Sequence, residues 1–159
     1  MKKAYITGAT GAIGMALVGE LLKNGISTTV FLRKDSGRND HVKDSFSREL
    51  ARGLLRIEYV SLEELSGYAL SRNTQDMQTY ASQDLLTKAA GGADTAVFYH
   101  LGWSGTFGEQ RNDADMQQKN VEYTLDAVRL AKRLGCVHFI GVGSQAEYGR
   151  FEGRLTPDT

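Results

Sequence analysis

AYITGATGAIG, the sequence of residues 4–14, brings an apolar strand, a glycine turn and the start of a helix together in one place. After Gly14, apolar residues recur at three- and four-residue intervals, which is typical of an amphipathic helix. Asn24 and Gly25 then end the predicted helix. The chain therefore opens with a strand–turn–helix unit.

The glycine spacing in this unit favours a dinucleotide site. Gly8 permits a sharp turn off the strand, Gly11 lets backbone N–H groups approach a diphosphate, and Gly14 allows the helix to pack closely on the sheet. The helix N-terminus adds unpaired N–H donors and partial positive charge. A Walker-type phosphate loop would need a Gly-Lys-Ser/Thr ending, which residues 14–16 lack. The alternative is an ordinary tight strand-to-helix turn.

The composition indicates one globular domain without an overall charge bias. Of the 159 residues 41% are hydrophobic, and the 19 basic and 19 acidic residues cancel, which argues against nucleic acid or a membrane surface as a partner. No stretch approaches the roughly twenty apolar residues of a membrane-spanning helix. Cys136 has no second cysteine to pair with, and no spacing suggests a metal site. We therefore expect a cytoplasmic protein.

Strand-like and helix-like segments alternate along the chain. The predicted strands are residues 4–6, 27–32, 54–60, 95–100 and 137–142. Apolar residues four apart predict a one-sided surface helix within residues 36–52, and a longer helix follows Asp113 with Val121, Leu125 and Val128 on one face. This alternation predicts an α/β, Rossmann-type doubly wound parallel sheet in three layers, with strand order 3-2-1-4-5, over residues 1–159.

The end of the second predicted strand bears on the choice of cofactor. About twenty residues beyond the glycines, an acidic side chain binds the adenosine ribose of NAD, whereas a cation accommodates the 2′-phosphate of NADP. Here the strand ends at Arg33 and Lys34, which favours NADP over NAD. The alternative is that both cations are solvated and Asp35 reaches back to the ribose.

The fourth predicted strand ends at His100 and runs into a loop of small residues, 101–105. Open α/β sheets bind ligands at such carboxyl ends. We interpret His100 as a packed histidine with one backbone hydrogen bond, rather than a ligand or proton relay. Trp103 is either a pocket wall or a cover of the core, and Ser61 and Leu62 are weaker cofactor candidates.

Four stretches carry a family resemblance, and they span nearly the whole chain. They are Thr7–Gly14, His100–Trp103, Asn120–Val121 with Thr124, and the run GSQAEYG at 143–149. In this order they resemble the extended short-chain dehydrogenase/reductase group, in particular the NAD-dependent epimerase/dehydratase proteins that act on nucleotide sugars. The resemblance implies cofactor contacts at Gly8, Thr10, Gly11, Ala12, Ile13, Gly14, Arg33, Lys34, Leu101 and Gly102. It also implies that Asn120 belongs to the active-site helix and that Ser144 binds the substrate oxygen.

The chain departs from this family in two respects. No Tyr-x-x-x-Lys pair occurs, since Tyr148 is followed at the fourth position by Glu152, and the chain stops at Thr159. We therefore expect the N-terminal, cofactor-binding part of a longer enzyme, without the C-terminal substrate lobe and inactive by itself. Residues 145–146, Gln-Ala, replace the acidic pair of nucleotide-sugar 4,6-dehydratases, which leaves epimerisation or 4-keto reduction of a nucleotide sugar.

A second hypothesis is a non-catalytic NADP-binding redox sensor, similar to relatives that keep the glycine loop and lose the catalytic pair. Asn120 and Ser144 favour the enzyme, because a sensor has no use for a serine that faces substrate. An exposed sheet edge, left by missing strands, would also favour pairing into a homo-oligomer.

Overall fold

The computed structural model describes residues 1–68, 95–143, 152–153 and 156. In chain order its elements are β1 (Lys3–Thr7), α1 (Ala12–Lys23), β2 (Ser27–Leu32), α2 (Asn39–Ser45), α3 (Ser47–Ala51), β3 (Leu55–Tyr59), the 3-10 turn η1 (Leu62–Glu64), β4 (Ala96–His100), the 3-10 turn η2 (Gly108–Asn112), α6 (Ala114–Arg133) and β5 (Cys136–Gly141). All five predicted strands are present. Ser144 and the run 145–149 lie outside the described residues.

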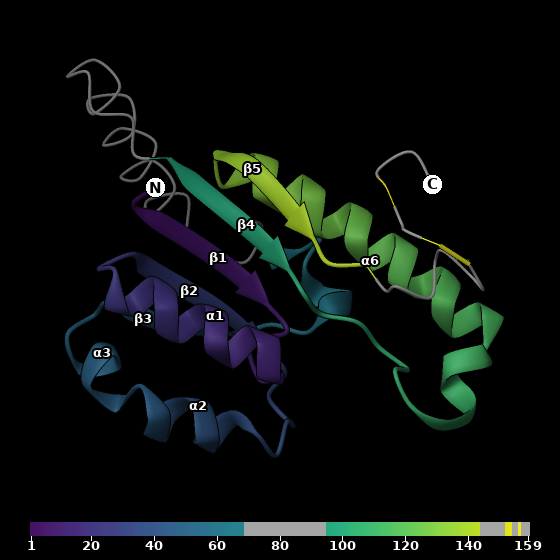
Figure 1. Cartoon of the computed structure of the whole chain (residues 1–159), viewed down its shortest axis with the longest axis horizontal. Coiled ribbons are helices and arrows are strands. Elements are labelled where there is room, and N and C mark those ends of the chain that lie inside the picture. Colours follow the sequence, from purple (N-terminus) through teal and green to yellow (C-terminus); the bar gives the residue numbers. More distant parts are fainter. Residues whose placement is uncertain (69–94, 144–151, 154–155, 157–159) are drawn as a thin grey trace.

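The five strands form one parallel sheet in the order β3-β2-β1-β4-β5 (Figure 1), which confirms the predicted strand order. In the register, Thr7 at the end of β1 pairs with Phe31 of β2 and with His100 of β4. The carboxyl ends of these central strands therefore lie at one edge of the sheet. The loops that follow them meet at this edge, where open α/β sheets bind ligands.

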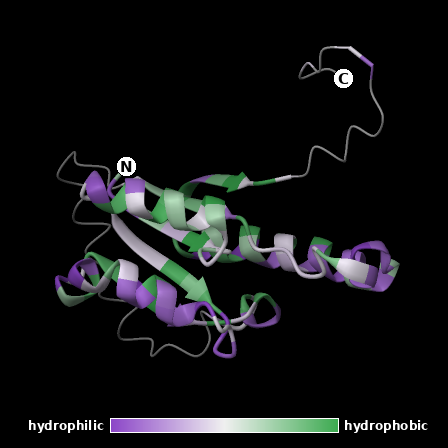
Figure 2. Ribbon diagram, turned by 60° about the horizontal axis from the view of Figure 1, so that its bottom comes forward, coloured by the Kyte–Doolittle hydropathy of each residue, from purple (hydrophilic) through white to green (hydrophobic). Residues whose placement is uncertain are grey.

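Side chains alternate across the strands, and each face of the sheet has its own core. One core joins β1, β2 and β3 to α1 and α2; its buried members are Ala4, Ile6, Ala9, Val18, Leu21, Leu22, Val30, Leu32, Val42 and Leu55. The other core joins β2 and β4 to α6 and the end of η1; its buried members are Phe31, Leu65, Phe98, Ala127, Leu130 and Ala131. In Figure 2 the helices carry both hydrophilic and hydrophobic residues. Helices thus cover both faces, as the three-layer prediction requires.

The predicted surface helix of residues 36–52 is two helices rather than one. At Phe46 the backbone leaves the helical region, with φ −125° and ψ 29°, and separates α2 from α3. The break allows the Phe46 ring to pack on the core beside Val42, close to Gly19 of α1. The apolar residues four apart do face the core, but a tertiary contact interrupts the helix between them.

The apolar stripe predicted on the longer helix, α6, points away from the core. Val121, Leu125 and Val128 are 42–49% exposed. The sheet instead receives the side of α6 that carries Ala127 and Leu130, both fully buried. The buried side of α6 thus combines the small Ala127 with the large Leu130, and the apolar stripe is not the side that packs on the sheet.

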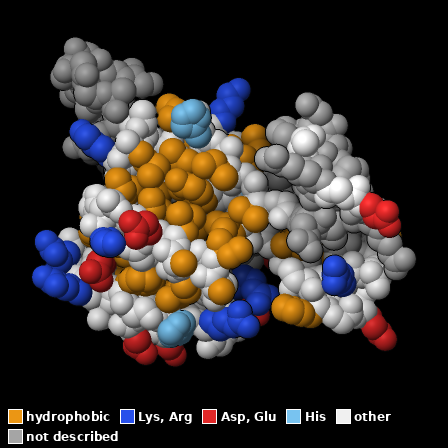
Figure 3. All heavy atoms as spheres, in the orientation of Figure 1, with side chains coloured by type: hydrophobic (Ala, Val, Ile, Leu, Met, Phe, Trp, Pro, Cys, Tyr) orange, Lys and Arg blue, Asp and Glu red, His pale blue; other side chains and the backbone are white. Residues whose placement is uncertain are grey.

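The described helices also leave uncovered a part of the sheet face that lies opposite α6. Ile140 of β5 and the following Val142 are 44% and 46% exposed. Figure 3 shows a broad apolar surface at the centre of this face.

None of the helices in the described ranges is long and apolar enough to cross a membrane.

We predict that Phe98→Ala lowers the free energy of unfolding by about 3–5 kcal/mol, the usual cost of emptying a buried aromatic site. The Phe98 side chain is 0% exposed, and its ring stacks 6.0 Å from Phe31 and 5.7 Å from Phe139. Urea denaturation measures the change. Phe107→Ala is the control, because Phe107 is 84% exposed and its loss should cost less than about 0.5 kcal/mol. Equal losses would contradict the assigned core.

A second prediction concerns His100, which is 4% exposed at the end of β4. Burial lowers the pKa of its imidazole to about 4. The unfolded chain takes up this proton near its ordinary pKa of about 6.5. The free energy of unfolding should therefore not change with the charge of His100 above that pH, and it should fall as the pH drops towards 4. The expected fall is about 2 kcal/mol between about pH 7.5 and about pH 5. Urea denaturation at both pH values tests this, and a His100→Gln chain with an undiminished pH dependence would contradict it.

Candidate functional site

The glycine turn, residues 7–14, has no room for side chains at two of its glycines. A Cβ on Gly14 would collide with the Gly8 carbonyl oxygen. A Cβ on Gly8, whose φ is +74°, would lie 2.6 Å from the carbonyl carbon of Leu101. Helix α1 therefore begins directly against the turn, and the turn lies directly against the loop that follows β4.

Gly11 differs from these two glycines. A Cβ there would meet only the Gly8 carbonyl oxygen, at 3.5 Å, which is ordinary van der Waals contact. The glycine at this position is not required by packing within the described part of the chain. Its missing side chain instead leaves the N-terminus of α1 open.

The N-terminus of α1 is suited to an anion. Gly11 is the N-cap and provides no side-chain cap, and the first turn contains no acidic residue. The backbone N–H groups of the first turn, at Ala12, Ile13 and Gly14, have no intrahelical acceptor. Ala12 and Ile13 are exposed, and Thr10 is half-buried beside them. Unpaired N–H donors together with the helix dipole favour a phosphate at this point.

The β4 loop, residues 101–105, is attached to the glycine turn by two hydrogen bonds. The Leu101 N–H donates to the Thr7 carbonyl oxygen and the Gly102 N–H to the Thr7 Oγ1, each at 3.2 Å. On its other side, a Cβ on Gly102 would lie 2.9 Å from Leu62 Cδ2. The structure therefore brings Leu101, Gly102 and Leu62 together with the glycine turn.

Asn120 holds the other end of the β4 loop. Its Oδ1 accepts from the Ser104 N–H at 2.9 Å, and its Nδ2 donates to the Ser104 carbonyl oxygen at 2.8 Å. The side chain lies on α6 and is 1% exposed. Nδ2 also donates to Gln117 Oε1 at 3.3 Å, so the amide of this predicted catalytic residue is engaged by the loop and by α6 itself.

Gln117, one turn earlier on α6, is a site residue that the sequence analysis missed. Its Oε1 accepts from the Trp103 indole N–H at 2.8 Å, and its Nε2 donates to the Gln110 carbonyl oxygen at 3.0 Å. The spacing of three residues from Asn120 places both side chains on one face of the helix. That spacing was the signal in the sequence from which Gln117 could have been identified.

His100 is packed, as predicted, but its ring does not have the predicted backbone partner. Its Nδ1 lies 2.8 Å from Thr7 Oγ1 and its Nε2 lies 3.3 Å from Thr124 Oγ1. The ring also stacks on Phe139, with 6.0 Å between the centroids. His100 therefore joins the glycine turn to α6.

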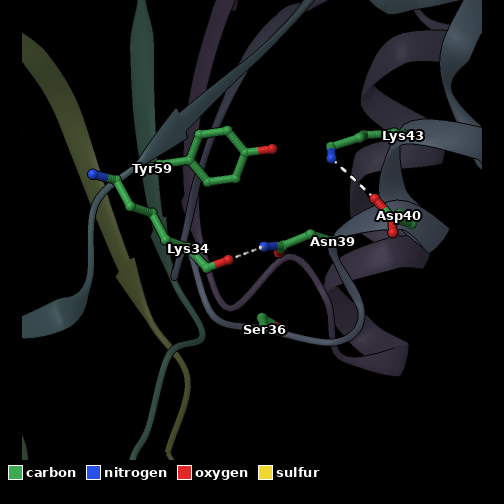
Figure 4. A pocket seen from close by; sticks show the side chains of 6 residues that line it. All are labelled: Lys34, Ser36, Asn39, Asp40, Lys43 and Tyr59. Carbon is green, nitrogen blue, oxygen red and sulfur yellow. Dashed lines mark hydrogen bonds and ion pairs between the residues drawn. The ribbon is translucent and has the colours of Figure 1, made fainter.

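The end of β2 forms a shallow pocket of about 300 Å³ (Figure 4). It is lined by Lys34, Ser36, Asn39, Asp40, Lys43 and Tyr59. Asn39 Nδ2 donates to the carbonyl oxygens of Arg33 and Lys34 at 2.8 and 3.2 Å, which fixes the backbone after β2. The Arg33, Lys34 and Asp35 side chains are all exposed. This exposure leaves both alternatives for the segment open: either Arg33 and Lys34 meet a 2′-phosphate, or Asp35 reaches the adenosine ribose.

Ser61, a weaker cofactor candidate, and the single cysteine both have structural explanations. The Ser61 N–H donates to Glu64 Oε2 at 2.8 Å in a capping box, so Ser61 begins η1. Burial raises the pKa of the Cys136 thiol to about 11, which keeps it protonated and unreactive near neutral pH. Among the residues that the structure describes, no group of His, Cys, Asp or Glu side chains is arranged to hold a metal.

Solved structures of longer proteins share this fold. The Bordetella bronchiseptica enzyme WbmH, in complex with NAD+, matches 94% of this chain and 41% of its own, with 19% identity and a TM-score of 0.59. MoeE5, in complex with UDP-glucose and NAD, matches 99% of this chain and 41% of its own, with 17% identity and a TM-score of 0.61. Gre2 from Candida albicans, in complex with NADPH, matches 92% and 38%, with 20% identity and a TM-score of 0.56.

At these identities the likeness shows the fold alone, and this chain spans about two fifths of the length of each of the three proteins. No curated protein matches the chain. The family comparison adds evidence from the sequence, because a model of the NAD dependent epimerase/dehydratase family matches residues 4–159. That match includes the glycine turn, the β4 loop and α6, and the chain belongs to the NAD dependent epimerase/dehydratase family.

Proposed function

We propose that this chain is the cofactor-binding part of a nucleotide-sugar epimerase or 4-keto reductase, and that it binds NADP in preference to NAD. The observation that carries the proposal is the open N-terminus of α1. There the glycine turn presents unpaired backbone donors, with no side chain at Gly11 and no acidic residue in the first turn. A diphosphate is the ligand that this combination of small residues and N–H groups favours.

Each group in the site has a role in this proposal. Gly8, Thr10, Gly11, Ala12, Ile13 and Gly14 hold the diphosphate, Arg33 and Lys34 hold the adenosine phosphate, and Leu101 and Gly102 lie along the nicotinamide-side ribose. When bound, the cofactor supplies the hydride acceptor and donor. Asn120 belongs to the reaction end of the site, and Ser144 hydrogen-bonds the substrate oxygen. A nucleotide sugar is the proposed substrate, and MoeE5, which shares the fold, is known with UDP-glucose and NAD.

A hydride transfer at a sugar carbon also needs a group that takes up or delivers a proton. In this family that group is a tyrosine activated by a lysine, and the chain contains no Tyr-x-x-x-Lys. We therefore propose that the chain binds its cofactor without turning over substrate by itself.

The diphosphate site predicts that Gly11→Ala weakens NADPH binding by about tenfold or more, because a methyl group would cover donors that the ligand needs. Folding should persist, since that Cβ meets its nearest neighbour at 3.5 Å. Titration followed by nicotinamide fluorescence measures the affinity. The control is Gly19→Ala in α1, whose Cβ would lie 3.7 Å from the Phe46 ring. Unchanged binding by Gly11→Ala would argue for a merely structural turn.

The cations after β2 predict a selective effect of Arg33→Ala. Loss of a charge-assisted contact should weaken NADPH binding by about 10- to 100-fold and leave NADH binding within about twofold. The same fluorescence titration, made with both cofactors, gives the two ratios. Arg52→Ala, which removes an exposed arginine at the C-cap of α3, is the matched control. An intact chain that prefers NADH would overturn the assignment of Arg33 and favour Asp35 as the ribose ligand.

A further inference from the structure

A chain of side-chain hydrogen bonds runs beneath the β4 loop, from Gly102 through Thr7 and His100 to Thr124 and Asn120. The Gly102 nitrogen lies 3.2 Å from Thr7 Oγ1, and Thr7 Oγ1 lies 2.8 Å from His100 Nδ1. On the other side of the ring, His100 Nε2 lies 3.3 Å from Thr124 Oγ1, which donates to the main-chain carbonyl oxygen of Asn120 at 2.9 Å. Thr7 is 1% and His100 is 4% exposed. Water therefore has little access to the centre of this chain.

The proton positions follow from its two ends. The main-chain carbonyl oxygen of Asn120 can only accept, and the Thr124 hydroxyl donates its single proton to it. Thr124 Oγ1 must then accept from His100, which places a proton on His100 Nε2. A neutral imidazole with Nε2–H has an acceptor at Nδ1.

The other end fits the same arrangement. Thr7 Oγ1 accepts from the Gly102 N–H, and with the proton of His100 on Nε2 the Thr7 hydroxyl can donate to the unprotonated Nδ1. A proton on Nδ1 would face this hydroxyl, and the Thr7 proton would lose its acceptor. Only one tautomer of His100 gives each hydroxyl in this chain one donor and one acceptor.

We infer that His100, held as its Nε2–H tautomer, is a positioning residue that joins the two anchors of the β4 loop into one unit. One anchor is Thr7, which holds Gly102 against the glycine turn. The other is Asn120, whose main-chain carbonyl receives the last link and whose side chain holds both backbone polar groups of Ser104. This inference rests on the proposed function, in which the β4 loop lies along the nicotinamide-side ribose. It assigns a directional role to a residue that the sequence analysis treated only as packed.

The first test is spectroscopic and needs no cofactor. Two-bond ¹H–¹⁵N spectra of the full chain, labelled on histidine, should show His100 with a protonated Nε2 and an unprotonated Nδ1. A spectrum with the proton on Nδ1 would overturn the inference. Because no ligand is added, this result is independent of whether the chain binds NADPH.

The second test breaks one link. Thr124→Val keeps the side-chain shape but removes the acceptor for Nε2–H, and it should shift the Gly102 and Ser104 amide resonances and weaken NADPH binding by about tenfold. Thr124→Ser should restore both. Thr28→Val is the matched control. It removes a buried hydroxyl that donates to the Ile26 carbonyl oxygen, at the start of β2 and therefore at the edge of the sheet away from the β4 loop. Unmoved Gly102 and Ser104 amides in Thr124→Val would overturn the inference, whereas failure of the unsubstituted chain to bind NADPH would count against the cofactor site instead.

Discussion

The backbone at the end of β1 passes so close to α1 and to the β4 loop that no Cβ fits at Gly8 or Gly14. This contact between main chains has two consequences for the site. It places the first turn of α1, with its unpaired N–H donors, beside the loop that follows β4. It also excludes side chains at Gly8 and Gly14, so neither of these positions can place a group over those donors. The proposed diphosphate site and the β4 loop therefore lie side by side at one edge of the sheet.

Helix α6 contributes to the same edge through polar side chains rather than apolar ones. Asn120 is 1% exposed, and leaving its amide unpaired would cost about 1–3 kcal/mol, so its two hydrogen bonds to Ser104 strongly favour one position of the loop. The helix reaches this depth because Ala127 and Ala131 pack against the sheet with little bulk. Val121, Leu125 and Val128 lie on the outward side. The hydrogen bonds from Asn120 to the β4 loop thus explain the orientation of α6 better than the apolar stripe does.

Much of this fold could be predicted from the sequence, and the parts that could not have physical reasons. Strand order followed from five apolar segments that alternate with helices, because parallel crossovers leave few topologies. The outward stripe of α6 was missed because periodicity identifies an apolar face without showing what covers it. The role of Gln117 and the partners of His100 were missed for a related reason. They depend on contacts between β1, β4 and α6, and spacing along one segment does not encode distances to another. The cofactor assignments, by contrast, remain predictions.

The end of β2 combines a fixed backbone with free side chains. Asn39 is 6% exposed and spends its Nδ2 on the carbonyl oxygens of Arg33 and Lys34, while its Oδ1 is buried without a partner among the described residues. The two cations that the turn presents are exposed. An exposed cation contributes little to stability, because water already solvates it. Its charge is therefore available to a phosphate, and any discrimination between NADP and NAD would come from this charge, presented by a backbone that Asn39 holds in place.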